Sequence, residues 1–213
     1  MRIQLQRVEP DYLAKSTLES SDVWGKQIQI EAPDGVILWG PSGQGKSTFF
    51  RILFGLERRY RGDLVIDGLP PSERPHRVWP EVRAERLAFV AQHFHLFEEK
   101  TGRENLEYLP RRAPGVKEED LNQWADYLGI AAILDRPPST WSQGQQQRFC
   151  ILRALASPFE FILLDEPVSH LDPDSAERSL KLIRTVCSER KAGWIISQQT
   201  AIPPFPAQQI LRV

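Results

Sequence analysis

The sequence predicts an α/β fold with an N-terminal antiparallel β region and a helical lobe, contained in one domain. Short apolar runs typical of buried strands alternate along the chain with segments of helical periodicity. Near the N-terminus the pattern instead alternates apolar and polar residues, as expected for half-buried antiparallel strands. The length of 213 residues fits one domain, and no internal repeat or low-complexity block divides it.

Composition excludes several classes of protein. The 27 basic and 28 acidic side chains leave a net charge of −1, which is unfavourable for a general nucleic-acid clamp. A hydrophobic fraction of 41% is too high for a disordered chain, and no apolar run approaches the roughly 20 residues that cross a bilayer. The N-terminus has no apolar signal-peptide segment. Cys150 and Cys187 are too few for a disulfide scaffold and indicate a reducing compartment.

Local patterns predict the elements of the first half of the chain. Residues 3–6 and 27–31 alternate apolar and polar side chains, which predicts antiparallel strands. Residues 36–39 are continuously apolar and precede a glycine-rich turn, as a buried strand would, and the apolar spacing in 47–54 predicts a helix. The apolar residues 64–66 predict a strand that enters a hairpin turn at Asp67-Gly68.

The second half is predicted in the same way. Short apolar runs predict buried strands at 87–90, 161–164 and 194–196. Apolar residues recur at helical spacing within 117–128, and a second helix is expected at 145–156. Loops within the domain are expected at three proline-rich stretches, residues 70–80, 110–114 and 203–206.

Residues 40–47 match the phosphate-binding pattern G-x-x-x-x-G-K-[ST] without exception. A predicted buried strand precedes this loop and a helix follows it, which makes a chance glycine-rich turn a poor alternative. Backbone N–H groups and the helix N-terminus would bind phosphate oxygens. Lys46 would reach the β- and γ-phosphates, and the Ser47 hydroxyl would ligate Mg²⁺. The candidate phosphate-binding residues are Gly40, Pro41, Ser42, Gly43, Gln44, Gly45, Lys46, Ser47 and Thr48.

A second magnesium ligand is expected at the end of another buried strand. Asp165 follows the apolar run 161–164 and could hold Mg²⁺ through water. Glu166 comes next, where a carboxylate can act as general base on an attacking water. An Asp-Glu pair is by itself an ordinary strand end. Together with the phosphate loop it indicates nucleotide hydrolysis.

The segment Trp141-Ser142-Gln143-Gly144-Gln145 separates this chain from other phosphate-loop proteins. It resembles the Leu-Ser-Gly-Gly-Gln signature of the ATP-binding cassette (ABC) family, the nucleotide-hydrolysing engines of ABC transporters. A serine hydroxyl and glycine N–H groups at a helix N-terminus suit a γ-phosphate, which in the family belongs to ATP held by the opposite subunit. An ordinary helix N-cap is the alternative for this serine. Its place shortly before Asp165 favours the signature, with Ser142, Gly144 and Gln145 as the binding residues.

The resemblance covers nearly the whole chain and assigns three further residues. Gln92, after the strand 87–90, matches the glutamine that senses Mg²⁺ and the attacking water. Asp172 matches the aspartate whose loop crosses the dimer interface. Tyr12 lies upstream of the phosphate loop, roughly where the family stacks an aromatic ring on adenine. An ordinary surface tyrosine is the alternative for Tyr12.

The resemblance implies a P-loop NTPase core of ABC type, an ATPase with ATP and Mg²⁺ as its ligands. Residues 1–213 would form one ABC ATPase domain, with a RecA-like core at about 1–92 and 157–213 and a helical lobe at about 93–156. Two copies, or two related chains, would close around Mg-ATP as a homodimer or heterodimer. A separate transmembrane permease subunit would hold this cytoplasmic protein at the inner face of the cell membrane. No direct contact with nucleic acid is expected.

Three positions depart from the family pattern. Gln198 stands where the family has its switch histidine, and we count Gln198 among the catalytic residues. It can donate a hydrogen bond to a γ-phosphate but cannot relay a proton, so ATP hydrolysis is expected to be slow. Gln143 replaces the first signature glycine, and its side chain could crowd the phosphate or add a donor. Trp141 replaces leucine, which we interpret as core packing. The four histidines show no metal-ligand spacing.

The run from Arg86 to Leu106 resembles the lipoprotein-release, macrolide-export and cell-division group of the family (LolD, MacB and FtsE). Phe94, Leu96 and Phe97 could line the groove that receives a coupling helix of the membrane subunit, or could be core residues of the helical lobe. Two other functions stay open. One is a non-transport ABC ATPase that regulates a membrane complex, as in the cell-division branch; the other is a soluble ABC ATPase acting on nucleic acid.

Overall fold

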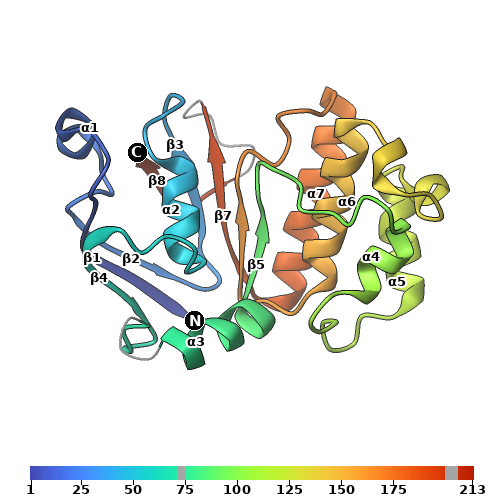
Figure 1. The fold of residues 1–213 in the computed structure, drawn as a ribbon, viewed down its shortest axis with the longest axis horizontal. Helices are drawn as coiled ribbons and strands as arrows, with labels where there is room; N and C mark the ends of the chain where they lie inside the picture. The colour runs from blue at the N-terminus through green and yellow to red at the C-terminus, as the bar shows by residue number, and fades with distance from the viewer. Residues whose placement is uncertain (72–74, 200–205) are drawn as a thin grey trace.

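The computed structural model describes residues 1–71, 75–199 and 206–213, which form two β-sheets with helices between and beside them (Figure 1). The smaller sheet is antiparallel, in the order β2 (Gln27–Glu31), β1 (Arg2–Pro10), β4 (Tyr60–Ile66). Ile3 lies opposite Ile30, and Leu5 lies opposite Leu64, all four on the buried face. The alternation of apolar and polar residues therefore predicted β1 and β2 correctly, and the apolar run 64–66 predicted the end of β4.

The larger sheet is parallel throughout and positions the functional site. Its order is β5 (Leu87–Val90), β6 (Phe161–Leu164), β7 (Gly193–Gln198), β3 (Gly35–Trp39), β8 (Gln209–Arg212). The central strands consist of fully buried apolar residues because helices or the other sheet cover both faces. All five carboxyl ends lie at one edge of the sheet, which is where ligands bind in open α/β sheets.

Alternate residues of the parallel sheet enter two different hydrophobic clusters. Val36 and Leu38 pack with Phe49 of α2 (Lys46–Leu53), which lies between the two sheets. Ile37 faces the opposite way, into the cluster that contains the buried sides of α6 (Gln143–Ala156) and α7 (Pro173–Arg190). The sheet is thus covered on both faces, and its edge beyond the strand ends is available for a ligand.

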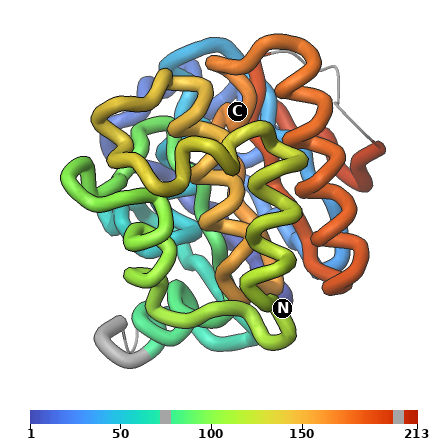
Figure 2. The backbone as a smooth tube through the Cα atoms, turned by 90° about the vertical axis from the view of Figure 1, so that its right-hand side faces the viewer, coloured from blue at the N-terminus to red at the C-terminus, as the bar shows by residue number. Residues whose placement is uncertain are grey.

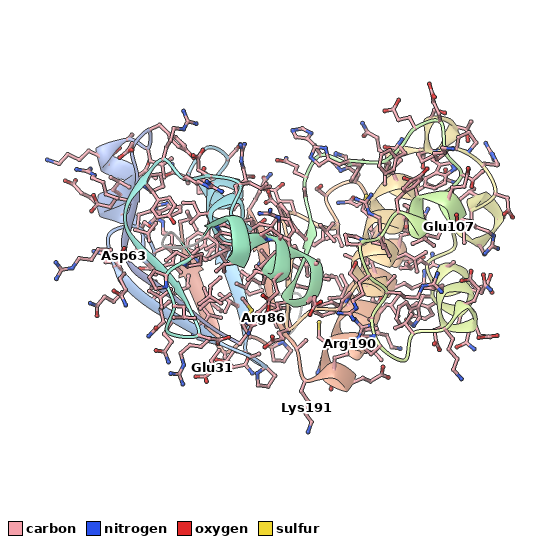
Figure 3. The ribbon with its side chains drawn as sticks, turned by 60° about the horizontal axis from the view of Figure 1, so that its bottom comes forward. Glu31, Asp63, Arg86, Glu107, Arg190 and Lys191 are labelled. Carbon is pink, nitrogen blue, oxygen red and sulfur yellow. The ribbon has the colours of Figure 1, made fainter. Side chains whose placement is uncertain are left out.

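Further helices lie beyond α6 and α7, on the side that faces the viewer in Figure 2. They are α4 (Gly102–Glu107), α5 (Glu118–Tyr127) and the 3₁₀ turns Ala131–Ile133 and Pro138–Thr140. Leu121 and Ala125 of α5 are buried against this region, as their helical spacing predicted. Arg190, labelled in Figure 3, donates to the Leu155 and Ser157 carbonyls at the end of α6. This ties α7 to α6 away from the site.

The structure corrects two expectations. Residues 70–80 were expected to be a loop, but they include most of α3 (Pro75–Glu81), and a π-helical turn (Val82–Arg86) follows it. Buried Trp79 anchors this helix; Pro75 stands at its first position, where proline is tolerated, and Pro80 lies in its interior. No second strand of a hairpin follows Asp67-Gly68, where the described chain makes only an isolated bridge. The third proline-rich stretch lies largely outside the described residues.

Three elements had no counterpart in the prediction: the short helix α1 (Lys15–Ser20), the helix α7 and the edge strand β8. Cys150 and Cys187 are buried free thiols, and burial raises the pKa of Cys150 to about 11 and that of Cys187 to about 12. They are structural rather than reactive. Of the helices in the described part of the chain, none combines the length and apolar character that a membrane span requires.

Candidate active site

A cavity of about 380 Å³ lies at the carboxyl edge of the parallel sheet. The strands β3, β5, β6 and β7 all end there, so their following loops meet although they are far apart in sequence. The residues that line the cavity are Tyr12, Leu13, Ser42, Gly43, Gly45, Lys46, Ser47, Thr48, Gln92, Glu166 and Gln199. Most of the predicted phosphate-binding residues and Gln92, Glu166 and Tyr12 are therefore brought together as the sequence indicated.

The phosphate loop connects β3 to α2 in the predicted way. Gly43 and Gly45 have φ values of 83° and 102°, a left-handed conformation in which glycine is strongly favoured. The Gln44 carbonyl accepts a hydrogen bond from the Trp24 indole at 3.4 Å, which fixes the middle of the loop. The cavity lies at the N-terminus of α2, where unpaired backbone N–H groups and the helix dipole favour an anion.

Lys46 is the first residue of α2 and only 5% exposed. Its ammonium group donates to the carbonyls of Gly40 at 2.7 Å and Pro41 at 3.0 Å. The same nitrogen lies 3.4 Å from a carboxylate oxygen of Glu166. The buried charge is thus held between the phosphate loop and the end of β6, in a position from which it can bind phosphate oxygens.

Asp165 and Glu166 follow β6 and share Ser197 as a partner. The Ser197 hydroxyl donates to Asp165 Oδ1 at 2.7 Å and accepts from the backbone N–H of Glu166 at 2.9 Å. Burial raises the pKa of Asp165, and hydrogen bonds from Ser47 and Ser197 act in the opposite direction. Ser197 was missed by sequence reasoning because its role depends on β7 lying next to β6.

The backbone of Glu166 is fixed in an unusual conformation, with φ of 49°. Its carbonyl accepts hydrogen bonds from Gln147 Nε2 and the Ser169 hydroxyl, both at 3.0 Å. This strained geometry, which is costly for a non-glycine residue, turns the carboxylate towards Lys46. Gln147 is a further residue that sequence reasoning did not assign to the site; it connects α6 to Glu166 and also accepts from the His170 N–H.

The two glutamines at the end of β7 differ in position. Gln198 lines an adjoining cavity of about 320 Å³, together with Glu166, Ser169 and Gln199. Gln199 lines both cavities, and its amide donates to Glu166 Oε2 at 3.5 Å. The motif order pointed to Gln198 alone; Gln199 is a further residue, and its side chain contacts the Glu166 carboxylate.

The signature segment lies at the N-terminus of α6 and outside the cavity lined by the phosphate loop. Ser142 is the N-cap: its hydroxyl accepts from the Gln145 N–H at 3.2 Å, and the Gln145 side chain accepts from the Ser142 N–H at 2.9 Å. The interpretation as a plain N-cap is therefore correct in geometry. It is compatible with phosphate binding, because a helix N-terminus with small residues remains open to an anion.

Other predicted residues take up local roles as well. Asp172 caps α7 by accepting from the Ser175 N–H at 2.9 Å, and this contact lowers the pKa of Asp172. Trp141 is 6% exposed and packs edge-on against Phe149, in agreement with core packing. Gln143 is exposed at the first position of α6. In the described part of the chain, no cluster of three or more His, Cys, Asp or Glu side chains suits a metal ion.

The parallel sheet with its phosphate loop, acidic strand end and glutamine-bearing loops defines a nucleotide-hydrolysing ATPase of the P-loop class. A family model described as ABC transporter matches residues 25–169. The chain belongs to this family of ATP-binding cassette proteins, and it is an ABC-type ATPase that binds ATP.

Individual relatives come from several branches of the family. The glutamine transport ATP-binding protein GlnQ of Bacillus subtilis is 34% identical over 188 residues, covering 86% of this chain and 77% of the relative. The lipoprotein-releasing system ATP-binding protein LolD of Saccharophagus degradans is 31% identical over 193 residues, covering 89% and 84%. Because both branches match at similar identity, the narrower resemblance to the LolD, MacB and FtsE group stays a prediction.

Solved structures give the same fold. The dimeric structure of the ATP-binding cassette MJ0796 in a post-hydrolysis state, bound to ADP and Pi, matches with a TM-score of 0.76 and 25% identity. The match covers 94% of this chain and 88% of that one. A bacterial Atm1-family ABC exporter with ATP bound matches with a TM-score of 0.74 and 26% identity over 92% of this chain and 34% of the exporter chain.

Proposed function

We propose that two copies of this chain, or this chain and a related one, close head to tail around two ATP molecules and drive a separate membrane permease. Each site would combine one chain's phosphate loop with the other chain's Ser142, Gly144 and Gln145. The observation that carries the proposal is the placement of the signature at an open helix N-terminus outside its own chain's cavity. The MJ0796 structure, a dimer with ADP and Pi bound, supports dimerisation.

Within each site, the loop N–H groups and Lys46 bind the β- and γ-phosphates, and Tyr12 stacks on the adenine ring. Glu166 orients the attacking water and accepts its proton, while Lys46 neutralises charge that develops on the γ-phosphate. Lys46 lies between the loop carbonyls and Glu166, a position that suits both the binding of the phosphates and the neutralisation of charge on the γ-phosphate. Asp172 and Gln198 would complete the site once the dimer closes.

The residues present suit Mg²⁺. Asp165 is a buried carboxylate whose pKa is raised by burial, so a cation beside it would remove an electrostatic cost. The Ser47 hydroxyl hydrogen-bonds this carboxylate, and Gln92 lines the same cavity. Together with phosphate oxygens, Ser47, Asp165 and Gln92 would hold the ion, which supplies charge neutralisation of the phosphates.

We further propose that residues 93–156 form a helical lobe that carries the signature and the permease contact, while residues 1–92 and 157–213 form the nucleotide core. The permease would place the protein at the inner face of the cell membrane. An exposed aromatic pair on this lobe supports the contact: Phe97 is 54% and Tyr108 is 56% exposed, with ring centroids 4.8 Å apart. Phe94 and Leu96 are partly buried against the core instead.

Removing an aromatic ring from this pair should weaken the permease contact. We expect Phe97→Ser to reduce recovery of a membrane subunit by at least about tenfold when the tagged chain is purified from detergent-solubilised membranes of its source. Mass spectrometry of the eluate measures this. ATPase activity of the isolated chain should stay normal, because Phe97 is exposed and outside the active site. Leu69→Ser, at an apolar residue that is exposed even more than Phe97, is the control. Equal recovery with both variants would contradict the proposed surface.

Substitutions of Gln198, the last residue of β7, and of Gln199, which follows it, test which side chain positions the general base Glu166. Gln199 donates to the Glu166 carboxylate, and both glutamines line the adjoining cavity. We expect Gln199→Ala to lower kcat about tenfold, with a smaller effect on KM, because it removes a hydrogen bond to the general base. Phosphate release at several ATP concentrations measures both constants. A larger loss with Gln198→Ala would assign the role to Gln198, as motif order suggests.

A further inference from the structure

Glu57 is a buried carboxylate close to the site that the mechanism above does not use. It follows α2 and is 6% exposed. Its Oε1 accepts from the N–H groups of Arg58 and Arg59 at 2.9 Å each, and from Arg59 Nε at 3.3 Å. Its Oε2 accepts from a terminal guanidinium nitrogen of Arg59 at 3.2 Å. These contacts, above all that with the Arg59 side chain, lower the pKa of Glu57 to about 2.

The same carboxylate holds Tyr12. The Tyr12 hydroxyl lies 3.3 Å from Glu57 Oε2 and 3.3 Å from the Thr48 hydroxyl of α2. The Arg59 guanidinium lies over the Tyr12 ring, 5.2 Å from its centroid. Tyr12 lines the cavity of the phosphate loop, whereas Arg59 does not belong to the cavity wall. Arg59 thus lies over the Tyr12 ring without lining the cavity itself.

Fixing this ring has an energetic consequence. A tyrosine that is 47% exposed would otherwise rotate freely, and ordering it on binding would cost affinity. Glu57 orders Tyr12 in advance and also fixes the cation that stacks on it. The charge of Glu57 is satisfied by its own partners, so the carboxylate does not compete with the nucleotide phosphates.

We propose that Glu57 is a positioning residue for the purine base of the nucleotide, acting through Tyr12 and with Arg59 as a cationic backing to the ring. The proposal rests on the stacking of Tyr12 on adenine under the proposed function. It adds that base affinity depends on the Glu57–Tyr12–Arg59 contacts, and that phosphate affinity does not.

Calorimetric titration of the full chain with ATP and with inorganic tripolyphosphate separates these two parts of the ligand. We expect Glu57→Gln to weaken ATP binding about fivefold while tripolyphosphate binding stays within about twofold. Arg59→Gln should weaken ATP binding about threefold, again without affecting tripolyphosphate. This second variant should fold, because the Arg59 side chain is 75% exposed and the backbone N–H groups of Arg58 and Arg59 still hold the Glu57 carboxylate. Glu31→Gln, which removes the exposed ion pair with Arg2 at the sheet edge (Figure 3), should change neither ligand.

Two further comparisons test whether Glu57 positions the base through Tyr12. If Glu57→Gln weakens both ligands equally, or neither, Glu57 is not a base-positioning residue and the inference is overturned. Tyr12→Ala tests the stacking on its own: without an ATP-selective loss, the proposed role of Tyr12 fails. If Tyr12→Ala shows the loss, adding Glu57→Gln should weaken ATP binding no further, because Glu57 acts through Tyr12. An additive double variant would overturn the inference and leave the stacking intact.

Discussion

Glu166→Gln is expected to lower ATP turnover by about 10²- to 10⁴-fold while ATP binding is retained. The substitution keeps the shape of the side chain but removes its capacity to accept a proton. The backbone of Glu166 is held by Ser197, Gln147 and Ser169, so the amide should remain in place beside Lys46. ATP would then hold the two chains together for longer, because the step that reopens the dimer is slowed.

Phosphate release measures the rate, and gel filtration with ATP and Mg²⁺ measures the dimer. Glu104→Gln is a matched control, because Lys100 and Glu104 lie at the same 3.4 Å as Lys46 and Glu166 but on the exposed side of α4. Glutamine also preserves the capping box that Glu104 makes with Thr101. Turnover of Glu166→Gln within about threefold of the unmodified chain would contradict the general-base role.

Features that could be predicted from the sequence depend on local pattern. The strands β3, β5 and β6 are short, fully apolar runs, and the phosphate loop carries its own spacing, so neither requires knowledge of the rest of the fold. Because β6 and β3 run parallel in one sheet with only β7 between them, Asp165 and Glu166 lie near the phosphate loop. The position of Tyr12 in the cavity also agrees with the sequence prediction.

The features that were missed depend on contacts between distant segments. Ser197, Gln147 and Glu57 become important only when β7 lies beside β6, when α6 reaches Glu166, and when Tyr12 folds over α2. The edge strand β8 is short and half exposed, so it lacks a continuous apolar run. In α7 the buried positions include Ser175 and Ser179, which dilutes the apolar periodicity, although Asp172-Pro173 is a clear start signal.

Lys46→Ala is expected to weaken ATP binding by at least about 100-fold and to abolish turnover, since it removes the buried cation that faces the phosphates.

Gly144→Asp should abolish turnover for another reason. The new carboxylate would repel a γ-phosphate approaching the N-terminus of α6. The added Cβ would lie 3.1 Å from the His170 carbonyl oxygen, a tight contact that requires a shift of a few tenths of an ångström. The fold should persist, because an acidic residue stabilises a helix N-terminus.

Mixing these two inactive variants tests whether each site is shared between chains. In a heterodimer, one site has both lesions, and the other combines the intact phosphate loop of Gly144→Asp with the intact signature of Lys46→Ala. With random pairing, half of the dimers are heterodimers, and we expect turnover to recover to about a quarter of the unmodified level. Lys46→Ala mixed with the chain that carries both substitutions should recover nothing, because no intact phosphate loop is present. If the two single variants also fail to recover on mixing, or if Gly144→Asp is active alone, the signature does not act on the ATP of the other chain.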